Sequence, residues 1–225
     1  MYTYCGNNPK IYIDFSGNDY YYYYGDDQEK AYKINKRLLE KSGEAVYGYY
    51  IDSQETFTDY WNDMNTTDND SIIINLHGND LGVQYMDINQ LNNKTLDTLY
   101  LLSCNGGRQD TTGNIASQVY NLFNINKLVA ADGLHTRKPS LFNRRIIHSI
   151  GLDEEQKKLK STKKSSKEPQ RVSQGFVLYN RDDENNINVV SIGKRFESII
   201  ELTEKTKYLH ISKNGNIHGG AGRKH

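Results

Sequence analysis

Two apolar runs determine the fold of this chain, Ser71-Ile-Ile-Ile-Asn-Leu-His77-Gly78 and Leu99-Tyr-Leu-Leu-Ser-Cys104-Asn-Gly106-Gly107. Each run is short, rich in isoleucine or leucine and free of charged residues, which is typical of strands buried on both faces of a parallel sheet. Parallel strands end at the same edge of their sheet, and open α/β sheets bind their ligands at that edge. We therefore expect His77 and Cys104 to lie side by side there, as a base and a nucleophile.

A third run, Lys127-Leu-Val-Ala-Ala-Asp132-Gly133, also ends in a polar residue followed by glycine. Core packing accounts for the apolar residues of the three runs, but it does not require this ending. Glycine allows the backbone to approach a substrate closely. We predict that the backbone N–H groups of Gly78 and Cys104 form an oxyanion hole, in which one donor is worth about 3–4 kcal/mol.

The remainder of the chain alternates strands and helices. Helical patterns cover 26–43 and 53–64, and another begins at Thr111 or Thr112; strand patterns cover 20–24, 45–51, 71–77, 96–104 and 127–133. The order β-α-β-α-β-β-α-β predicts an α/β fold with a mostly parallel central sheet, joined by right-handed crossovers and flanked by helices. Further strands over 175–179 and 187–192 form a predicted hairpin, followed by a predicted short helix over 195–203.

Composition excludes several classes of protein. Lys plus Arg equals Asp plus Glu, 28 each, so net charge does not favour binding to nucleic acid or to an anionic membrane. No stretch approaches the roughly 20 apolar residues of a membrane span, and the first residues do not resemble a signal peptide. Two cysteines, Cys5 and Cys104, are no disulfide framework, although a bond between them is left open.

No cofactor or metal site is predicted. The other histidines show no metal-ligand spacing and are interpreted as surface or loop residues: His135, His148, His210, His218 and His225. The sequence has no Walker A motif, no Gly-x-Gly-x-x-Gly and no paired Cys-x-x-Cys. An α/β-hydrolase is disfavoured, because Leu102 stands where its nucleophile elbow has the first glycine.

Residues 1–17 resemble the closing motif of the RHS-repeat core. The matching residues are two spaced tyrosines, an Asn-Asn-Pro and an Asp-x-x-Gly: Tyr2, Tyr4, Asn7, Asn8, Pro9, Asp14 and Gly17. The resemblance implies the end of a β-rich shell that a variable effector, often a toxin, follows. It also implies a piece of a longer exported protein, with any export signal upstream of Met1. The family usually has proline where this chain has Phe15, a departure that bears on the self-cleavage known in parts of the family.

A second resemblance covers roughly residues 45–135. The two segments around His77 and Cys104 are similar to the caspase–gingipain–clostripain group of cysteine peptidases, including the separase-like CHAT domains. In that group His-Gly closes one core strand and Cys closes the next, and here Cys104 lies 27 positions after His77. The resemblance implies a caspase-like three-layer sandwich, with Cys104 as nucleophile, His77 as base or acid and Gly78 by the oxyanion hole. It implies no third catalytic residue at a fixed position.

Asp132 and Gly133 close the next strand, and we predict that they line the pocket for the residue before the cleaved bond. A carboxylate there favours Arg or Lys on charge grounds. The alternative is that Asp132 is a turn or helix-cap residue.

Residues 153–171 are charged, mostly basic and almost without apolar side chains, which predicts a flexible loop. A processing linker and a polyanion-binding segment are the alternatives. The domain boundaries expected are therefore 1–17 for the RHS tail, 18–212 for the caspase-like domain and 213–225 for a disordered tail.

The leading hypothesis is a cysteine endopeptidase that serves as the effector or toxin domain of a bacterial RHS-type polymorphic protein. It would be secreted or displayed on the cell surface, and delivered into a target cell. Its expected partners are a protein or peptide substrate, the RHS shell and an immunity protein, with no nucleic acid and no membrane span. The alternatives are an inactive interaction module on the same scaffold and a toxin of other chemistry, such as a nuclease.

Overall fold

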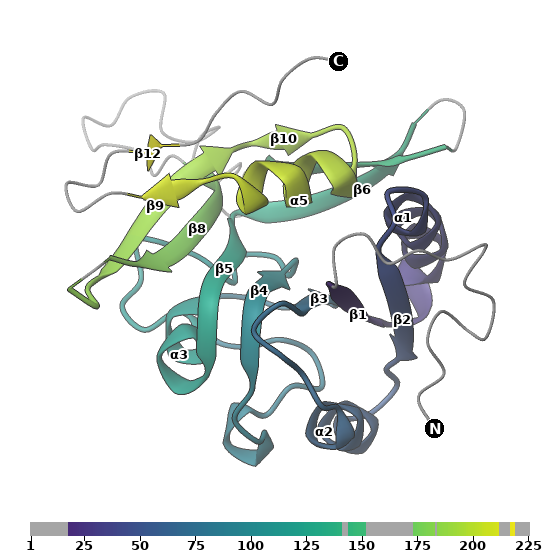
Figure 1. Cartoon of the computed structure of the whole chain (residues 1–225), viewed down its shortest axis with the longest axis horizontal. Coiled ribbons are helices and arrows are strands. Elements are labelled where there is room, and N and C mark those ends of the chain that lie inside the picture. The colour runs from purple at the N-terminus through teal and green to yellow at the C-terminus, as the bar shows by residue number, and fades with distance from the viewer. Residues whose placement is uncertain (1–17, 141–143, 152–172, 183, 212–216, 219–225) are drawn as a thin grey trace, which may run out of the picture.

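The computed structural model describes residues 18–140, 144–151, 173–182, 184–211 and 217–218 (Figure 1). The RHS-like segment 1–17 and the basic stretch 153–171 lie outside these residues, so the predictions made for them stay predictions. Most of the tail 213–225 lies outside them as well. Within that tail, β12 (Ile217–His218) pairs with β11 (His210–Ile211), and the predicted domain boundaries stay a prediction.

A seven-stranded mixed sheet forms the centre of the fold, with the strand order β2-β1-β3-β4-β5-β8-β9. Its strands are β1 (Asp19–Tyr24), β2 (Ala45–Tyr50), β3 (Ser71–Asn75), β4 (Thr95–Leu101), β5 (Asn124–Asp132), β8 (Gly175–Arg181) and β9 (Ile187–Gly193). The first five run parallel, and β8 and β9 form an antiparallel hairpin against β5. The predicted α/β order through β5 and the predicted hairpin are therefore confirmed.

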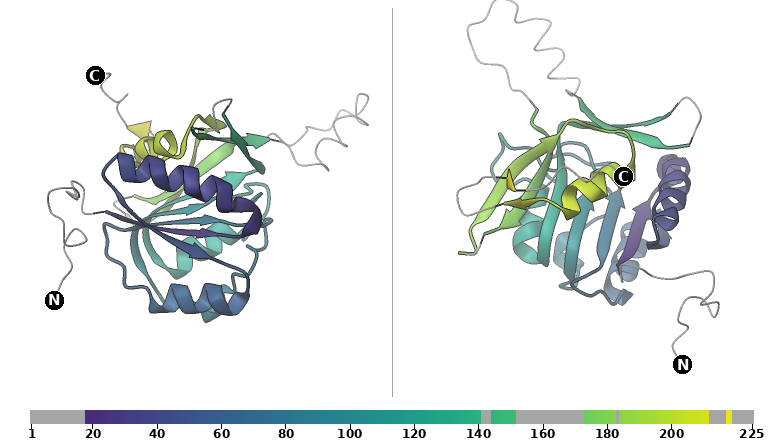
Figure 2. Two further views of the ribbon diagram at one scale, coloured as in Figure 1. Left: turned by 90° about the vertical axis from the view of Figure 1, so that its right-hand side faces the viewer. Right: turned by 45° about the horizontal axis from the view of Figure 1, so that its top comes forward.

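Four α-helices in the described residues cover both faces of this sheet (Figure 2). They are α1 (Glu29–Lys41), α2 (Gln54–Asp63), α3 (Ile115–Leu122) and α5 (Ile199–Lys207). One hydrophobic cluster joins α2 and α3 to the sheet, and a second joins α1 and α5 to it. Two short 3-10 helices complete the described helical elements of this part of the chain. The first, η2 (Asp26–Gln28), follows β1, and the second, η3 (Ile88–Gln90), precedes β4.

The tyrosine run 20–24 forms β1, between β2 and β3. The sequence suggested an interface or an amphipathic strand, whereas Tyr22 and Tyr23 are both buried, one on each face. A strand inside a two-faced parallel sheet has no solvated side, which explains the difference. The Tyr22 hydroxyl accepts hydrogen bonds from the amides of Asn35 and Asn75, so its burial leaves no unpaired oxygen.

A three-stranded antiparallel sheet was not predicted. It consists of β6 (Leu134–Pro139), β7 (Ile146–Gly151) and β10 (Arg195–Phe196), in the order β10-β7-β6. The helix expected from 195 was wrong at its start, because Ser198 caps α5 and residue 195 is in a strand. The cap of α3 is Asn114, whose side chain accepts from Ser117 N, rather than Thr111 or Thr112. None of the helices in the described ranges combines the length and the apolar character that a bilayer crossing needs.

We expect Phe57→Ala to lower the free energy of unfolding by about 3–5 kcal/mol, since it removes a large side chain from the core. Phe57 is 0% exposed and packs against Tyr23 and Trp61. Urea denaturation followed by circular dichroism measures the change. The matched control is Leu122→Ala on α3, where the side chain is 49% exposed and the expected change is within about 0.5 kcal/mol. Equal losses in both variants would contradict the packing described above.

Candidate functional site

The ends of β3 and β4 lie at the same level of the sheet. Ile74 pairs with Leu101 in parallel register, and Leu102 N donates a hydrogen bond to Ile74 O at 2.9 Å. His77 is three residues beyond Ile74, and Cys104 is three residues beyond Leu101. The strands end at Asn75 and Leu101, earlier than the sequence suggested, so both residues lie in the loops that leave the sheet.

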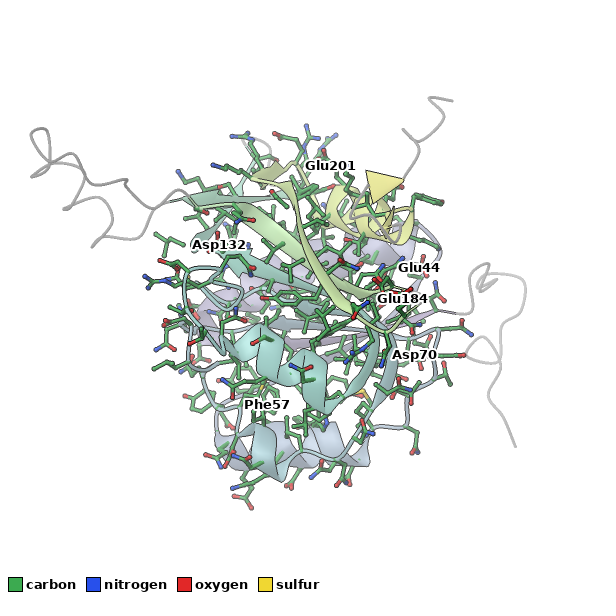
Figure 3. All side chains as sticks on the ribbon, turned by 90° about the vertical axis from the view of Figure 1, so that its left-hand side faces the viewer. Glu44, Phe57, Asp70, Asp132, Glu184 and Glu201 are labelled. Atoms are coloured by element: carbon green, nitrogen blue, oxygen red, sulfur yellow. The ribbon has the colours of Figure 1, made fainter. Side chains whose placement is uncertain are left out.

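This edge is the carboxyl edge of the parallel strands. Figure 3 shows Asp132, the last residue of β5, at one end of the sheet. Glu44 and Asp70, which precede β2 and β3, lie at the other end. The backbone of residue 105 donates from its N–H to Gly133 O at 2.8 Å, so the end of β5 is tied to the loop that carries Cys104. The three polar endings in the sequence thus belong to one region.

Gly78 lies directly against the β4 loop. A Cβ at this position would be 2.8 Å from Ser103 Cβ and 2.7 Å from Gly82 O, which is too close for any side chain. The segment after Gly78 folds back as a tight hairpin, in which Asn79 N donates to Gly82 O at 2.9 Å and Gln84 N to His77 O at 2.8 Å. An open hollow of about 420 Å³ is lined by His77, Gly78, Asn79, Gly82, Val83 and Gln84.

The His77 side chain is 56% exposed and is oriented by the turn that follows β1. Its Nε2 is 2.7 Å from Asp27 Oδ2 and 3.1 Å from Gln28 Nε2. A carboxylate oxygen can only accept, so Nε2–H donates to Asp27 and leaves Nδ1 available for another group. Asp27 is not among the predicted site residues, because it falls in the helical pattern 26–43 and only the tertiary fold brings it to His77.

The Cys104 thiol is half-buried and has a different partner. Its Sγ donates to the backbone carbonyl of His135 at 3.7 Å. Within the described part of the chain, the thiol and the His77 imidazole are not hydrogen-bonded to each other, since each is directed to another group. The structure therefore places both groups at the same edge of the sheet in a state in which no proton passes between them.

Several backbone and side-chain groups around Cys104 have no partner in the part of the chain that the structure describes. Among the described residues, neither the Gly78 nor the Cys104 backbone N–H donates to a protein acceptor. Ser103 Oγ and Asn105 Oδ1 are buried and likewise lack a partner there. Asn105 also has a φ of 55°, a left-handed conformation that is uncommon outside glycine. Strained backbone and unpaired buried polar groups concentrate at functional sites.

Asp132 and Gly133, the predicted pocket residues, are packed within the protein. Asp132 is buried, and its carboxylate accepts from Gln109 N at 3.2 Å and from Gln174 N at 2.7 Å. Gly133 has a φ of 147°, and a Cβ there would be 2.6 Å from Gly151 O. Asp132 thus joins the loop after Cys104 to the segment that enters β8, and its role in a pocket stays a prediction.

Two histidines interpreted as surface or loop residues are in the interior, so that interpretation was wrong. His135 on β6 is 4% exposed and His148 on β7 is 0% exposed. His135 Nδ1 lies 2.9 Å from Leu102 O, and its Nε2 lies 3.1 Å from His148 Nδ1. A carbonyl only accepts, so His135 Nδ1–H donates to Leu102 O, and His148 Nδ1–H donates to His135 Nε2. Both rings are then neutral.

This pair continues into a buried polar network. The Asn35 amide lies 3.4 Å from His148 Nε2 and also donates to the Tyr22 hydroxyl at 3.0 Å. Burial lowers the pKa of His135 well below its ordinary value and that of His148 to about 3, and the nearby Arg137 guanidinium lowers both further. Both imidazoles therefore stay uncharged over the physiological pH range.

Two further observations delimit the site. Among the described residues, no group of three or more His, Cys, Asp or Glu side chains is placed to hold a metal ion. No family model matches the chain, and neither a curated protein nor a solved structure matches it. The function is therefore argued from the arrangement of the residues at the carboxyl edge.

We expect Gly78→Ala to destabilise the fold by about 1–3 kcal/mol, because the new methyl group overlaps Ser103 and the Gly82 carbonyl. Gly82→Ala in the same hairpin is the control, since no atom lies within 4 Å of a Cβ there. Thermal unfolding of the two variants measures the difference. Equal stability of Gly78→Ala and Gly82→Ala would contradict the close packing of Gly78 against Ser103 and the Gly82 carbonyl.

We expect the stability of the fold to fall as the pH drops below about 6.5, the ordinary histidine pKa. The pKa values of His135 and His148 are lower in the folded chain, so the unfolded chain binds protons first. At pH 5 the free energy of unfolding is lower by ~2 kcal/mol for each of the two histidines. Above pH 6.5 neither histidine makes the free energy of unfolding depend on pH. Urea titrations at pH 7.5, 6.5 and 5.0 check this, and His148→Asn should reduce the slope. A flat profile would contradict burial of the pair.

Proposed function

We propose that this chain is a cysteine endopeptidase in which Cys104 is the nucleophile and His77 is the base and acid. The observation that carries the proposal is the register of β3 and β4, in which Ile74 pairs with Leu101. His77 and Cys104 each lie three positions beyond one of these two residues, at the carboxyl edge. That edge is where open α/β sheets bind ligands. A thiol and an imidazole at one such edge form the nucleophile and base of a covalent mechanism.

The chemistry follows from the groups present. The thiolate of Cys104 attacks the carbonyl carbon of the scissile peptide, and the unused N–H groups of Gly78 and Cys104 hold the oxygen that gains the negative charge. His77 Nδ1, which receives the thiol proton, gives it to the leaving amine as the C–N bond breaks. Water then attacks the thioester with His77 as base, releasing the acid and restoring the thiol. Asp27 orients the imidazole throughout through its contact with Nε2.

The mostly parallel sheet with helices on both faces supports the finer assignment of a caspase-like three-layer sandwich. Asp132 and Gly133 are packed within the protein and lend this assignment no support, so the pocket for a basic residue before the cleaved bond stays a prediction. The RHS-like segment 1–17 supports the further proposal of a toxin or effector domain of a larger exported protein. Target proteins or the parent chain are then the substrates, and an immunity protein is a partner.

The test of the proposed function is Cys104→Ala. We expect this variant to lose cleavage of fluorogenic Arg and Lys peptides and of the parent chain, because it lacks the nucleophile, while circular dichroism shows an unchanged fold. Cys5→Ala is the matched control and should retain full activity, because the second thiol has no part in the mechanism. Cleavage by the Cys104→Ala variant would sink the proposal.

One observation favours a second candidate, an inactive interaction module. The thiol is directed to His135 O and the imidazole to Asp27, not to each other. Iodoacetamide labelling at pH 6 separates the two functions, because an ordinary thiol has a pKa near 8.5 and reacts slowly there. Labelling of Cys104 much faster than Cys5 supports the peptidase, and slow labelling of both supports the module.

We expect Asp27→Asn to lower kcat by about 10- to 100-fold with little change in KM, because the carboxylate that orients His77 is lost. The effect is smaller than for a buried carboxylate, since this pair is open to solvent. Asp26→Asn is the control: it removes the same charge one residue away, where the carboxylate instead accepts from the Tyr50 hydroxyl. Equal effects of the two changes would show a general charge effect rather than orientation of the imidazole.

A further inference from the structure

We propose that His135 is a positioning residue for Cys104, and that His148 holds His135 in the orientation this requires. The inference rests on the proposed function, because it explains how the nucleophile is kept at the sheet edge. It concerns two residues that touch neither the proposed substrate nor His77.

His135 holds the nucleophile loop at two points. Its imidazole Nδ1–H donates to Leu102 O at 2.9 Å, two residues before the nucleophile. Its own backbone carbonyl accepts from Cys104 Sγ at 3.7 Å. Two backbone hydrogen bonds continue the same junction, from Asn105 N to Gly133 O at 2.8 Å and from Gly107 N to Ala131 O at 3.0 Å. Four residues of the turn 102–107 are therefore held by the segment 131–135, namely Leu102, Cys104, Asn105 and Gly107.

His148 leaves His135 one orientation. The two rings are stacked with centroids 5.3 Å apart and planes inclined by 11°, and His148 Nδ1 lies 3.1 Å from His135 Nε2. Phe176 meets the His135 ring edge-on, with centroids 5.6 Å apart. Rotating the His135 ring by half a turn would put the ring carbons Cδ2 and Cε1 where Nδ1 and Nε2 now lie, so that Leu102 O and His148 Nδ1–H would both lose their partners.

Simple packing does not require this arrangement. An apolar residue would fill the same interior space without the cost of desolvating two imidazoles. A fully connected buried polar network, in contrast, fixes one geometry, because every alternative leaves a buried group unpaired. Charged and titratable groups that face the pair are Arg137 on β6 and Tyr22 on β1, the latter through Asn35 on α1. None of these offers His135 a substitute acceptor for Nδ1–H in place of Leu102 O.

The experiment compares His135→Leu with His135→Asn. Leucine keeps the volume but has no donor, whereas the asparagine amide can still donate to Leu102 O. Hydrogen exchange of the Asn105 and Gly107 amides reports whether the turn is held, and it needs no enzymatic activity. We expect at least 10-fold faster exchange at these two amides in His135→Leu, with unchanged exchange at Ile73 and Val129 in the core strands, and exchange within threefold of wild type in His135→Asn.

Kinetics provide the second readout. We expect His135→Leu to lower kcat about 10-fold at unchanged KM, and His135→Asn to restore most of it. His148→Leu should give a smaller change in the same direction, and His148→Asn should restore it. Where a leucine variant does not fold, the asparagine variants decide: exchange of Asn105 and Gly107 at wild-type rates supports the proposal, and exchange as fast as that of an unfolded chain overturns it.

The outcomes separate the two proposals. Wild-type exchange at Asn105 and Gly107 in folded His135→Leu would overturn the positioning role and leave the peptidase intact. Absence of peptidase activity in the wild-type chain would overturn the proposed function, and with it the catalytic purpose of His135. A loss of core protection at Ile73 and Val129 equal to that at Asn105 would show a merely structural role and would overturn the inference as well.

Discussion

The parallel hydrogen-bonded pairing of β3 with β4 is the constraint on which the rest of this structure depends. It sets Ile74 beside Leu101, and so it determines which residues of the two loops share a level at the carboxyl edge. A slip of one residue would turn every side chain of one strand to the other face. Such a slip would be costly here, because Ile72 and Ile74 pack on the α2–α3 side while Ile73 packs on the α1–α5 side.

The same constraint concentrates polar groups where the strands end. Within the sheet, backbone groups pair with neighbouring strands, but at the carboxyl edge the chains diverge and the pairing stops. The backbone groups there find hydrogen-bond partners in the loops instead. These partners lie in the hairpin after Gly78, in the turn after Cys104 and in the Asp132 carboxylate. Among the described residues, the N–H groups of Gly78 and Cys104 have no backbone acceptor. The polar groups at this edge thus follow from the incomplete backbone pairing where the strands end.

The buried His135–His148 pair connects this edge to the second sheet. It lies between β4, through Leu102 O, and α1, through Asn35, so it couples the turn of Cys104 to a helix on one face of the main sheet. Neutral imidazoles suit this place, since each has one donor and one acceptor and can extend a hydrogen-bonded chain through an apolar interior. The Cys104 turn is therefore held on its buried side by His135, and His77 is contacted on its exposed side by Asp27.

Local patterns in the sequence determined the five parallel strands, the β8–β9 hairpin and the sheet edge to which His77, Cys104 and Asp132 belong, because short uncharged apolar runs are typical of strands covered on both faces. Asp27 and the His135–His148 pair were decided by tertiary structure alone. Asp27 reaches His77 through the pairing of β1 with β3, about 50 residues away. The histidines occupy core positions of β6 and β7, where polar side chains hide the alternation that reveals a strand, and their burial depends on mutual hydrogen bonds that no local pattern encodes.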